Sequence, residues 1–141
     1  MSAATRELVA DRRDVWELVG EPYNLPDWWP GYSGVRPDRR GLAEGARWHV
    51  VRSAGPGLVR RPGAEGTIVV ARVVEGYELA WLDPVQRLEC GVALDNAGSG
   101  RTRATAFARG PLLRLLLEGG FALPRQAVTR LFALCQTAAE P

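Results

Sequence analysis

Apolar and polar positions divide the chain into a short N-terminal helical part, a long stretch of strands and a helical tail. Residues 4–11 alternate weakly between apolar and polar side chains, which predicts a first strand. Apolar side chains then recur at threes and fours over residues 11–19, and a glycine and a proline end this stripe. A second short helical turn is expected over residues 25–29, where Pro30 and Gly31 stop it.

Six further segments have the alternation or the β-branched composition that is typical of strands. Turns rich in glycine, proline and polar residues separate them, and Asn-Ala-Gly-Ser-Gly at 96–100 is a strong hairpin signal. Because consecutive segments are joined mostly by short turns, they predict an antiparallel sheet. The segments are residues 32–38, 46–53, 67–74, 77–82, 87–95 and 101–108.

The tail, residues 111–140, changes to a helical period, and Pro111 suits the start of a helix. The Gly119-Gly120 pair and Pro124 interrupt the apolar stripe, which predicts a kink or a break. The long apolar helix must cover the apolar face of the sheet. We therefore expect a single α+β domain over residues 1–141, with two short helices after the first strand.

Several segments in this order carry a family resemblance. They are "DVWELVGEPYNLPDWWPGYSGV", "GARW", "VVEGYELAW", "GRTRAT" and the long C-terminal helix. The chain resembles the START-like superfamily, also called the helix-grip or Bet v 1-like fold (SRPBCC), which includes polyketide cyclase/dehydrase proteins. The resemblance covers nearly the whole chain. It implies a curved antiparallel sheet of about six to seven strands wrapped on the C-terminal helix, with a cavity between the two.

Composition narrows the classes of partner. The 18 basic residues, all arginine, nearly balance 16 acidic ones, and a net charge of +2 does not argue for nucleic acid or an anionic membrane. No apolar run is long enough to span a membrane.

The two cysteines, Cys90 and Cys135, are isolated and are expected to be free thiols. Without an N-terminal apolar leader, the expected location is cytoplasmic, and no cofactor or metal is expected.

Two adjacent tryptophans stand in residues 24–34, a segment rich in proline and glycine. Neighbouring side chains on a helical turn differ in direction by about 100°. We therefore expect one of Trp28 and Trp29 to anchor the turn in the core and the other to face the cavity or solvent. The alternative is an aromatic plug that fills one end of the core. By the resemblance, this segment lies at the rim of the cavity.

The candidate ligand-binding residues lie on the face of the sheet that alternation assigns to the interior, or near the mouth of the cavity. Aromatic side chains on that face either fill a core or line a cavity, and the pattern leaves both readings open. Phe121 and Arg125 follow or flank the helix break and are placed near the mouth. The full set is Trp28, Trp29, Tyr32, Trp48, Val50, Arg52, Tyr77, Trp81, Leu88, Cys90, Val92, Phe121 and Arg125.

Arg52 shares the predicted inner face with Trp48. An unpaired guanidinium in a core is costly, so Arg52 lies beyond the covered zone, pairs with an acid, or meets a ligand carbonyl or carboxylate. Arg52 and Tyr77 are the candidates for polarising a carbonyl in a reaction. His49, the only histidine, falls on the opposite face, and neither a catalytic triad nor a metal-binding spacing occurs.

Three functions remain open at this point. The leading expectation is binding of a small hydrophobic ligand, aromatic or polyketide-like, in the internal cavity. The second is an enzyme of polyketide cyclase, aromatase or dehydratase type. The third is an interaction protein, comparable to a chaperone co-factor, with a filled core and an exposed apolar patch. Neither the ligand nor the choice between monomer and homodimer follows from the sequence.

Overall fold

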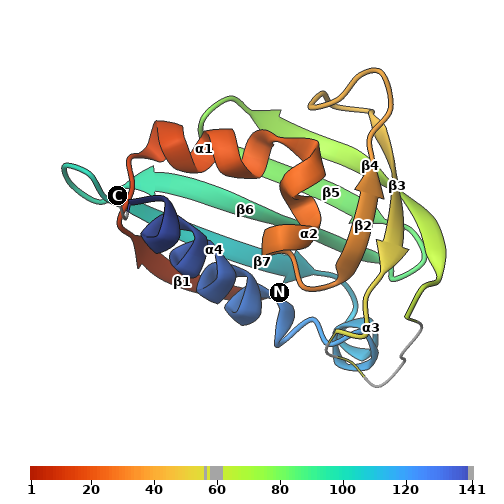
Figure 1. Ribbon diagram of the computed structural model, residues 1–141. Coiled ribbons are helices and arrows are strands. Elements are labelled where there is room, and N and C mark those ends of the chain that lie inside the picture. The colour runs from red at the N-terminus through yellow and green to blue at the C-terminus, as the bar shows by residue number, and fades with distance from the viewer. Residues whose placement is uncertain (56, 58–61, 140–141) are drawn as a thin grey trace.

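The computed structural model describes residues 1–55, 57 and 62–139, and Figure 1 shows their arrangement. Regular structure covers most of them. In chain order the elements are β1 (Ser2–Leu8), α1 (Arg12–Gly20), the 3-10 turn η1 (Pro22–Asn24), α2 (Leu25–Trp28), β2 (Tyr32–Arg36), β3 (Arg47–Arg52), β4 (Glu65–Val74), β5 (Glu78–Asp83), β6 (Leu88–Asn96), β7 (Thr102–Arg109), α3 (Leu112–Leu117) and α4 (Leu123–Ala139).

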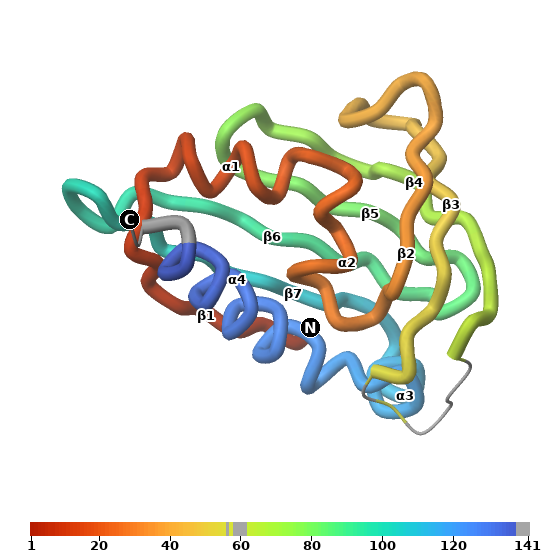
Figure 2. The backbone as a smooth tube through the Cα atoms, in the orientation of Figure 1, coloured from red at the N-terminus to blue at the C-terminus, as the bar shows by residue number. Residues whose placement is uncertain are grey.

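The strands form one seven-stranded antiparallel sheet in the order β1-β7-β6-β5-β4-β3-β2. Every strand from β2 to β7 pairs with its neighbour in sequence, while β1 closes the far edge against β7. Helices α1, α2 and α4 lie on the same face of this sheet (Figures 1 and 2). The predicted α+β fold, with short helices after the first strand and a long C-terminal helix on the sheet, is confirmed.

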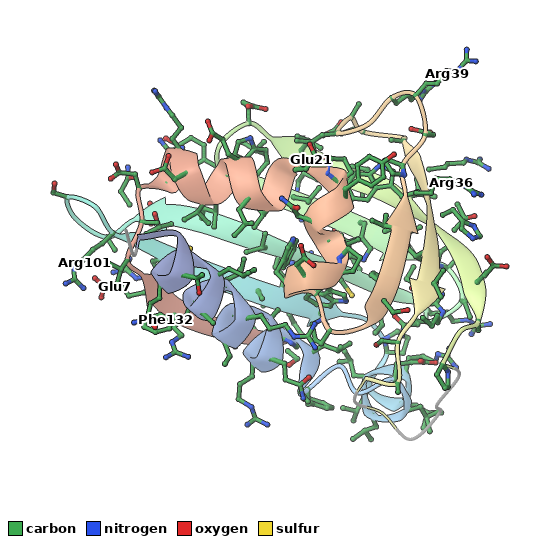
Figure 3. The ribbon with its side chains drawn as sticks, in the orientation of Figure 1. Glu7, Glu21, Arg36, Arg39, Arg101 and Phe132 are labelled. Carbon is green, nitrogen blue, oxygen red and sulfur yellow. The ribbon has the colours of Figure 1, made fainter. Side chains whose placement is uncertain are left out.

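The covered face of the sheet is apolar because alternate residues of each strand point toward the helices. On β6 these residues are Leu88, Cys90, Val92 and Leu94, and all are buried. On β7 the corresponding positions are alanines, which leave room for α4 to pack on β7 and β1. Phe132 of α4 lies beside β1 (Figure 3), and the Arg6 guanidinium of β1 is 3.9 Å from the centre of its ring.

The helical tail is broken at the predicted place. Helix α3 ends at Leu117, and α4 begins at Leu123. Gly119 lies between them with φ of +74°, a left-handed conformation that glycine adopts without steric cost. Gly120 packs so closely on α3 that a Cβ atom there would lie 2.5 Å from Leu115 Cδ2. None of the described helices combines the length and the apolar content needed to cross a membrane.

Gly91 of β6 lies on the outer face of the sheet, the face opposite the helices, where neighbouring atoms leave no room for a side chain. A Cβ atom at Gly91 would lie 2.2 Å from the Leu79 carbonyl oxygen and 2.8 Å from Phe107 Cζ. Since the first obstacle is backbone, Gly91→Ala should lower the free energy of unfolding by about 2–3 kcal/mol. Urea denaturation measures this loss.

Gly34→Ala is the matched control for that substitution. Its added Cβ would meet only Val51 side-chain atoms at 3.5–3.6 Å, an ordinary contact distance. The control should change the free energy of unfolding by less than about 1 kcal/mol. Equal losses for the two variants would contradict the packing described here.

Candidate functional site

Three tryptophan rings form the centre of the covered face. Trp28 and Trp29 come from the end of α2, and Trp81 comes from β5. The ring centroids of Trp29 and Trp81 lie 5.1 Å apart, and those of Trp28 and Trp81 lie 5.8 Å apart, in edge-to-face arrangements. Such arrangements are the favoured ones for aromatic pairs. We call these three rings the tryptophan cluster.

Both adjacent tryptophans are fully buried, in contrast to the expectation that one of them faces the cavity or solvent. The physical reason lies in the backbone. Helix α2 ends at Trp28, and Trp29 leaves the helix with φ −95° and ψ 117°. This change of backbone conformation turns two consecutive side chains toward the same interior, which a continuous helix would not allow.

Most of the other predicted lining residues are also packed against protein atoms. Trp48, Val50, Cys90 and Val92 have 0% exposure, so no water-sized space touches these side chains. The same face is thus filled at these positions in the structure. Trp48 also donates a hydrogen bond from its indole nitrogen to the Gly41 carbonyl at 2.8 Å. Leu88, the first residue of β6, is also buried, with 1% of its surface exposed.

Three predicted site residues lie away from the tryptophan cluster. Tyr77 is 44% exposed in the turn before β5, where the Arg12 guanidinium of α1 covers its ring at 3.9 Å. Phe121 is 48% exposed in the α3–α4 connection, and Arg125 is exposed in the first turn of α4. The structure therefore does not bring these side chains together with the buried aromatic residues.

A buried polar group adjoins the tryptophan cluster. Arg52, at the end of β3, forms a two-pronged ion pair with Asp83, at the end of β5. The second prong joins Arg52 Nη2 and Asp83 Oδ1 at 2.8 Å. Tyr32 donates from its hydroxyl to Asp83 Oδ2 at 2.8 Å, and Trp81 donates from its indole nitrogen to the Tyr32 hydroxyl at 3.1 Å. The backbone of Gln86 supplies a further donor to Asp83.

The sheet itself assembles this polar group. Tyr32 and Arg52 are paired across β2 and β3, so their side chains emerge side by side. Gly66 on β4 leaves space for the guanidinium, since a Cβ atom there would lie 3.2 Å from Arg52 Nη2. Asp83 is not among the site residues that the sequence predicts. The signal was the alternation of Leu79, Trp81 and Asp83 on one face of β5.

Burial sets the protonation of these groups. Burial raises the pKa of the Tyr32 phenol well above its usual value, and the charge of Asp83 raises it further. The phenol therefore remains a hydrogen-bond donor. Burial opposes the charge of Arg52, but the hydrogen bonds and charge of Asp83 outweigh it and raise the pKa of the guanidinium. Burial also raises the pKa of Cys90 well above its usual value, which leaves a neutral, unreactive thiol.

The polar group continues to α3. Gln86 donates from its side-chain amide to Glu118 Oε2 at 3.2 Å, and Arg114 donates to Glu118 Oε1 at 3.0 Å. Arg114 also donates to the carbonyl of Gln86 at 3.1 Å and to that of Val85 at 2.6 Å. Arg52 thus neutralises the buried carboxylate of Asp83, and Arg114 neutralises that of Glu118. The bonds of Arg114 also tie α3 to the turn after β5.

Two of the five indole nitrogens differ from the rest. Trp16 donates to Glu75, Trp48 donates to Gly41, and Trp81 donates to Tyr32. The indole nitrogens of Trp28 and Trp29 are buried and have no hydrogen-bond partner among the described residues. Buried donors without an acceptor are rare in folded proteins.

The remaining chemistry lies on the surface. His49 contacts Glu65 at 3.0 Å, with its side chain 31% exposed, on the face opposite Trp48. Within the described ranges, no group of three or more His, Cys, Asp or Glu side chains is arranged to hold a metal ion.

The same fold occurs in solved structures of low sequence identity. XoxI from Bacillus cereus matches with a TM-score of 0.69 at 12% identity, over 100% of both chains. NE0264 from Nitrosomonas europaea matches with a TM-score of 0.66 at 23% identity, over 96% of this chain and 94% of its own. DynU16, from the dynemicin biosynthetic locus, matches at 0.69 and 19% identity over 97% of this chain and 47% of its own.

At these identities the likeness shows a shared fold of the helix-grip type and nothing further. No family model and no curated protein matches the sequence. The function therefore has to be argued from the residues of this chain.

The buried ion pair provides a stability test. Arg52→Met leaves Asp83 buried without its cation and should lower the free energy of unfolding by about 3–5 kcal/mol. Asp83→Leu should have a comparable effect, because it strands the guanidinium. The loss of stability in the double variant should be about 1–3 kcal/mol smaller than the sum of the losses in the two single variants. Urea denaturation of the four proteins measures this coupling.

Arg101→Met is the control for this cycle. Arg101 pairs with Glu7 at 3.3 Å, with side chains 54% and 49% exposed (Figure 3). An exposed pair contributes little, so the control should change the free energy of unfolding by less than about 1 kcal/mol. Strictly additive losses for Arg52→Met and Asp83→Leu would show that the pair is not coupled as described.

Proposed function

We propose that the protein binds a small, flat hydrophobic molecule, aromatic or polyketide-like, between the sheet and helices α2 and α4. Family resemblance suggests this place, since members of the START-like superfamily use the space between the sheet and the C-terminal helix. The observation that carries the proposal is the pair of buried indole N–H groups of Trp28 and Trp29, which have no acceptor among the described residues.

A hydrogen-bond acceptor on a ligand would give these indole N–H groups the partner that they lack among the described residues. Leaving a buried donor unsatisfied costs about 1–3 kcal/mol. A ligand carbonyl or ether oxygen placed beside either indole nitrogen would recover that energy. Trp28, Trp29 and Trp81 would at the same time supply apolar ring surface for stacking on a flat molecule. The proposed ligand is therefore apolar and flat, with at least one hydrogen-bond acceptor.

Binding requires the tryptophan cluster to open, since no water-sized space touches its rings in the structure. Opening would require a displacement of α2, a helix of four residues that Pro30 and Gly31 follow, together with its buried Leu25 and Trp28. The polar contacts to this segment come from Ser53, which donates from its side chain to the Pro30 carbonyl and from its backbone to the Gly31 carbonyl at 3.1 Å, and from Arg130, which donates to the Pro26 carbonyl at 3.4 Å. Displacement of α2 would expose the indole N–H groups to a ligand while the sheet stays intact.

Binding is favoured over catalysis by the state of Arg52. Two of its N–H groups are engaged by Asp83, which cancels the charge that would polarise a carbonyl. Tyr77, the other catalytic candidate, is 44% exposed and stacks under Arg12 instead. The proposed role is accordingly that of a carrier or binding protein.

Indole nuclear magnetic resonance tests the proposal. In 15N-labelled protein, saturating 9-fluorenone, a flat aromatic ketone, should shift the side-chain N–H signals of Trp28 and Trp29. Signals are assigned with single Trp→Phe variants. The N–H signal of Trp16 should stay in place, because it is already bonded to Glu75 at 3.0 Å.

Fluorene is the matched control ligand, since it has the same shape without the carbonyl oxygen. It should bind about five-fold more weakly, which corresponds to one hydrogen bond of about 1 kcal/mol. Unchanged Trp28 and Trp29 signals at saturating concentrations of fluorenone and of other flat carbonyl compounds would refute the proposed binding.

A further inference from the structure

Helix α3 lies at the opposite end of the molecule from the loop between β6 and β7 (Figures 1 and 2), and exposed apolar side chains occur on it and beside it. Leu112, Leu113 and Leu116 are 66%, 65% and 53% exposed, and Phe121, which follows α3, is 48% exposed. Val85, in the turn to which Arg114 bonds, is 46% exposed. We call these five residues the α3 patch. Exposed apolar side chains scattered singly are ordinary, but a contiguous group of this kind marks an interaction surface.

Helix α3 is fixed to the body of the protein by one buried face and by Arg114. Leu115 and Glu118 are buried beneath the helix, which leaves the three leucines of the patch on the outer side. Arg114 anchors the helix through the carbonyl of Val85 at 2.6 Å and through Glu118 at 3.0 Å. Arg114 thus ties α3 to the turn after β5 while Leu112, Leu113 and Leu116 stay exposed.

The charges that border the α3 patch are positive. Arg87 and Arg125 are exposed, and Arg109 has a half-exposed side chain. The backbone of Arg87 lies close to Gly110, which comes just before α3. A Cβ atom at Gly110 would be 2.7 Å from the Arg87 carbonyl oxygen. Arg125 follows Phe121 by four residues, in the first turn of α4. A shallow hollow of about 410 Å³ beside the patch includes both Arg87 and Arg109 in its lining.

The carboxylates in the same region pair with other arginines, Arg109 included, and leave Arg87 and Arg125 without an ion-pair partner among the described residues. Asp83 is buried and paired with Arg52, and Glu118 is buried and paired with Arg114. Glu89 is 17% exposed and contacts both Arg72 and Arg109. The overall charge of +2 therefore conceals a local excess of exposed arginine around an apolar helix.

We infer that the α3 patch docks this protein on an anionic lipid surface. Leucine and phenylalanine side chains would enter the boundary between headgroups and acyl chains, while the bordering arginines would bind lipid phosphates. A second copy of the chain is a poorer occupant, since a symmetric contact would bring the same arginine border against itself. The inference does not depend on the proposed ligand, because no residue of the tryptophan cluster takes part in it.

Vesicle sedimentation tests this inference. The full chain should bind vesicles of phosphatidylcholine mixed with phosphatidylglycerol, and bind pure phosphatidylcholine vesicles at least about ten-fold more weakly. Leu113→Glu combined with Leu116→Glu should abolish binding. Arg87→Gln combined with Arg125→Gln should weaken it about thirty-fold, because each arginine near the surface contributes about 1 kcal/mol.

Tyr23→Glu is the matched control, because Tyr23 is 64% exposed on η1, outside the α3 patch. It should bind vesicles as the unaltered chain does. Circular dichroism should show that all variants remain folded, since each altered side chain is exposed. Absence of binding to the mixed vesicles, or binding that survives Leu113→Glu with Leu116→Glu, overturns the inference. A dimer that the same double variant converts to monomer in sedimentation velocity would also overturn it.

Discussion

Burial of one apolar face of the seven-stranded sheet is the constraint on which the rest of this structure depends. Helices α1, α2 and α4 share that task, and α2 is only four residues long. Large rings compensate for the short helix: a buried tryptophan removes roughly 150–250 Å² from water. Trp28 and Trp29 thus extend the reach of α2 to Trp81 on β5, while alanines on β7 let α4 approach the other half of the sheet.

Polar groups inside this layer fall into two kinds. Asp83 receives hydrogen bonds from Arg52, Tyr32 and the Gln86 backbone, so its charge is fully compensated and serves to fix the ends of β2, β3 and β5. The indole N–H groups of Trp28 and Trp29, which are buried in the same layer, have no such acceptor among the described residues. This contrast between satisfied and unsatisfied buried groups is the support for the proposed ligand site.

The fold was largely predictable from the sequence, because alternation defines strands and a helical period defines the tail. The site was less predictable. Trp29 points inward only because the backbone becomes extended at the end of α2, a tertiary effect that local pattern does not contain. Tyr77 shares the period of Leu79 and Trp81 but lies in the turn before β5, outside the covered zone. Likewise, the apolar spacing of α3 predicts a buried helix, whereas the break at Gly119-Gly120 leaves its leucines exposed.

An experimental structure of the protein saturated with 9-fluorenone is the most direct measurement of the central claim. The ketone should lie between α2 and the sheet, with its oxygen about 3 Å from the indole nitrogen of Trp28 or Trp29. Helix α2 should also be displaced while the Arg52–Asp83 pair is retained. A ketone bound elsewhere, with the tryptophan cluster unchanged and both indole nitrogens still unpaired, would contradict the account.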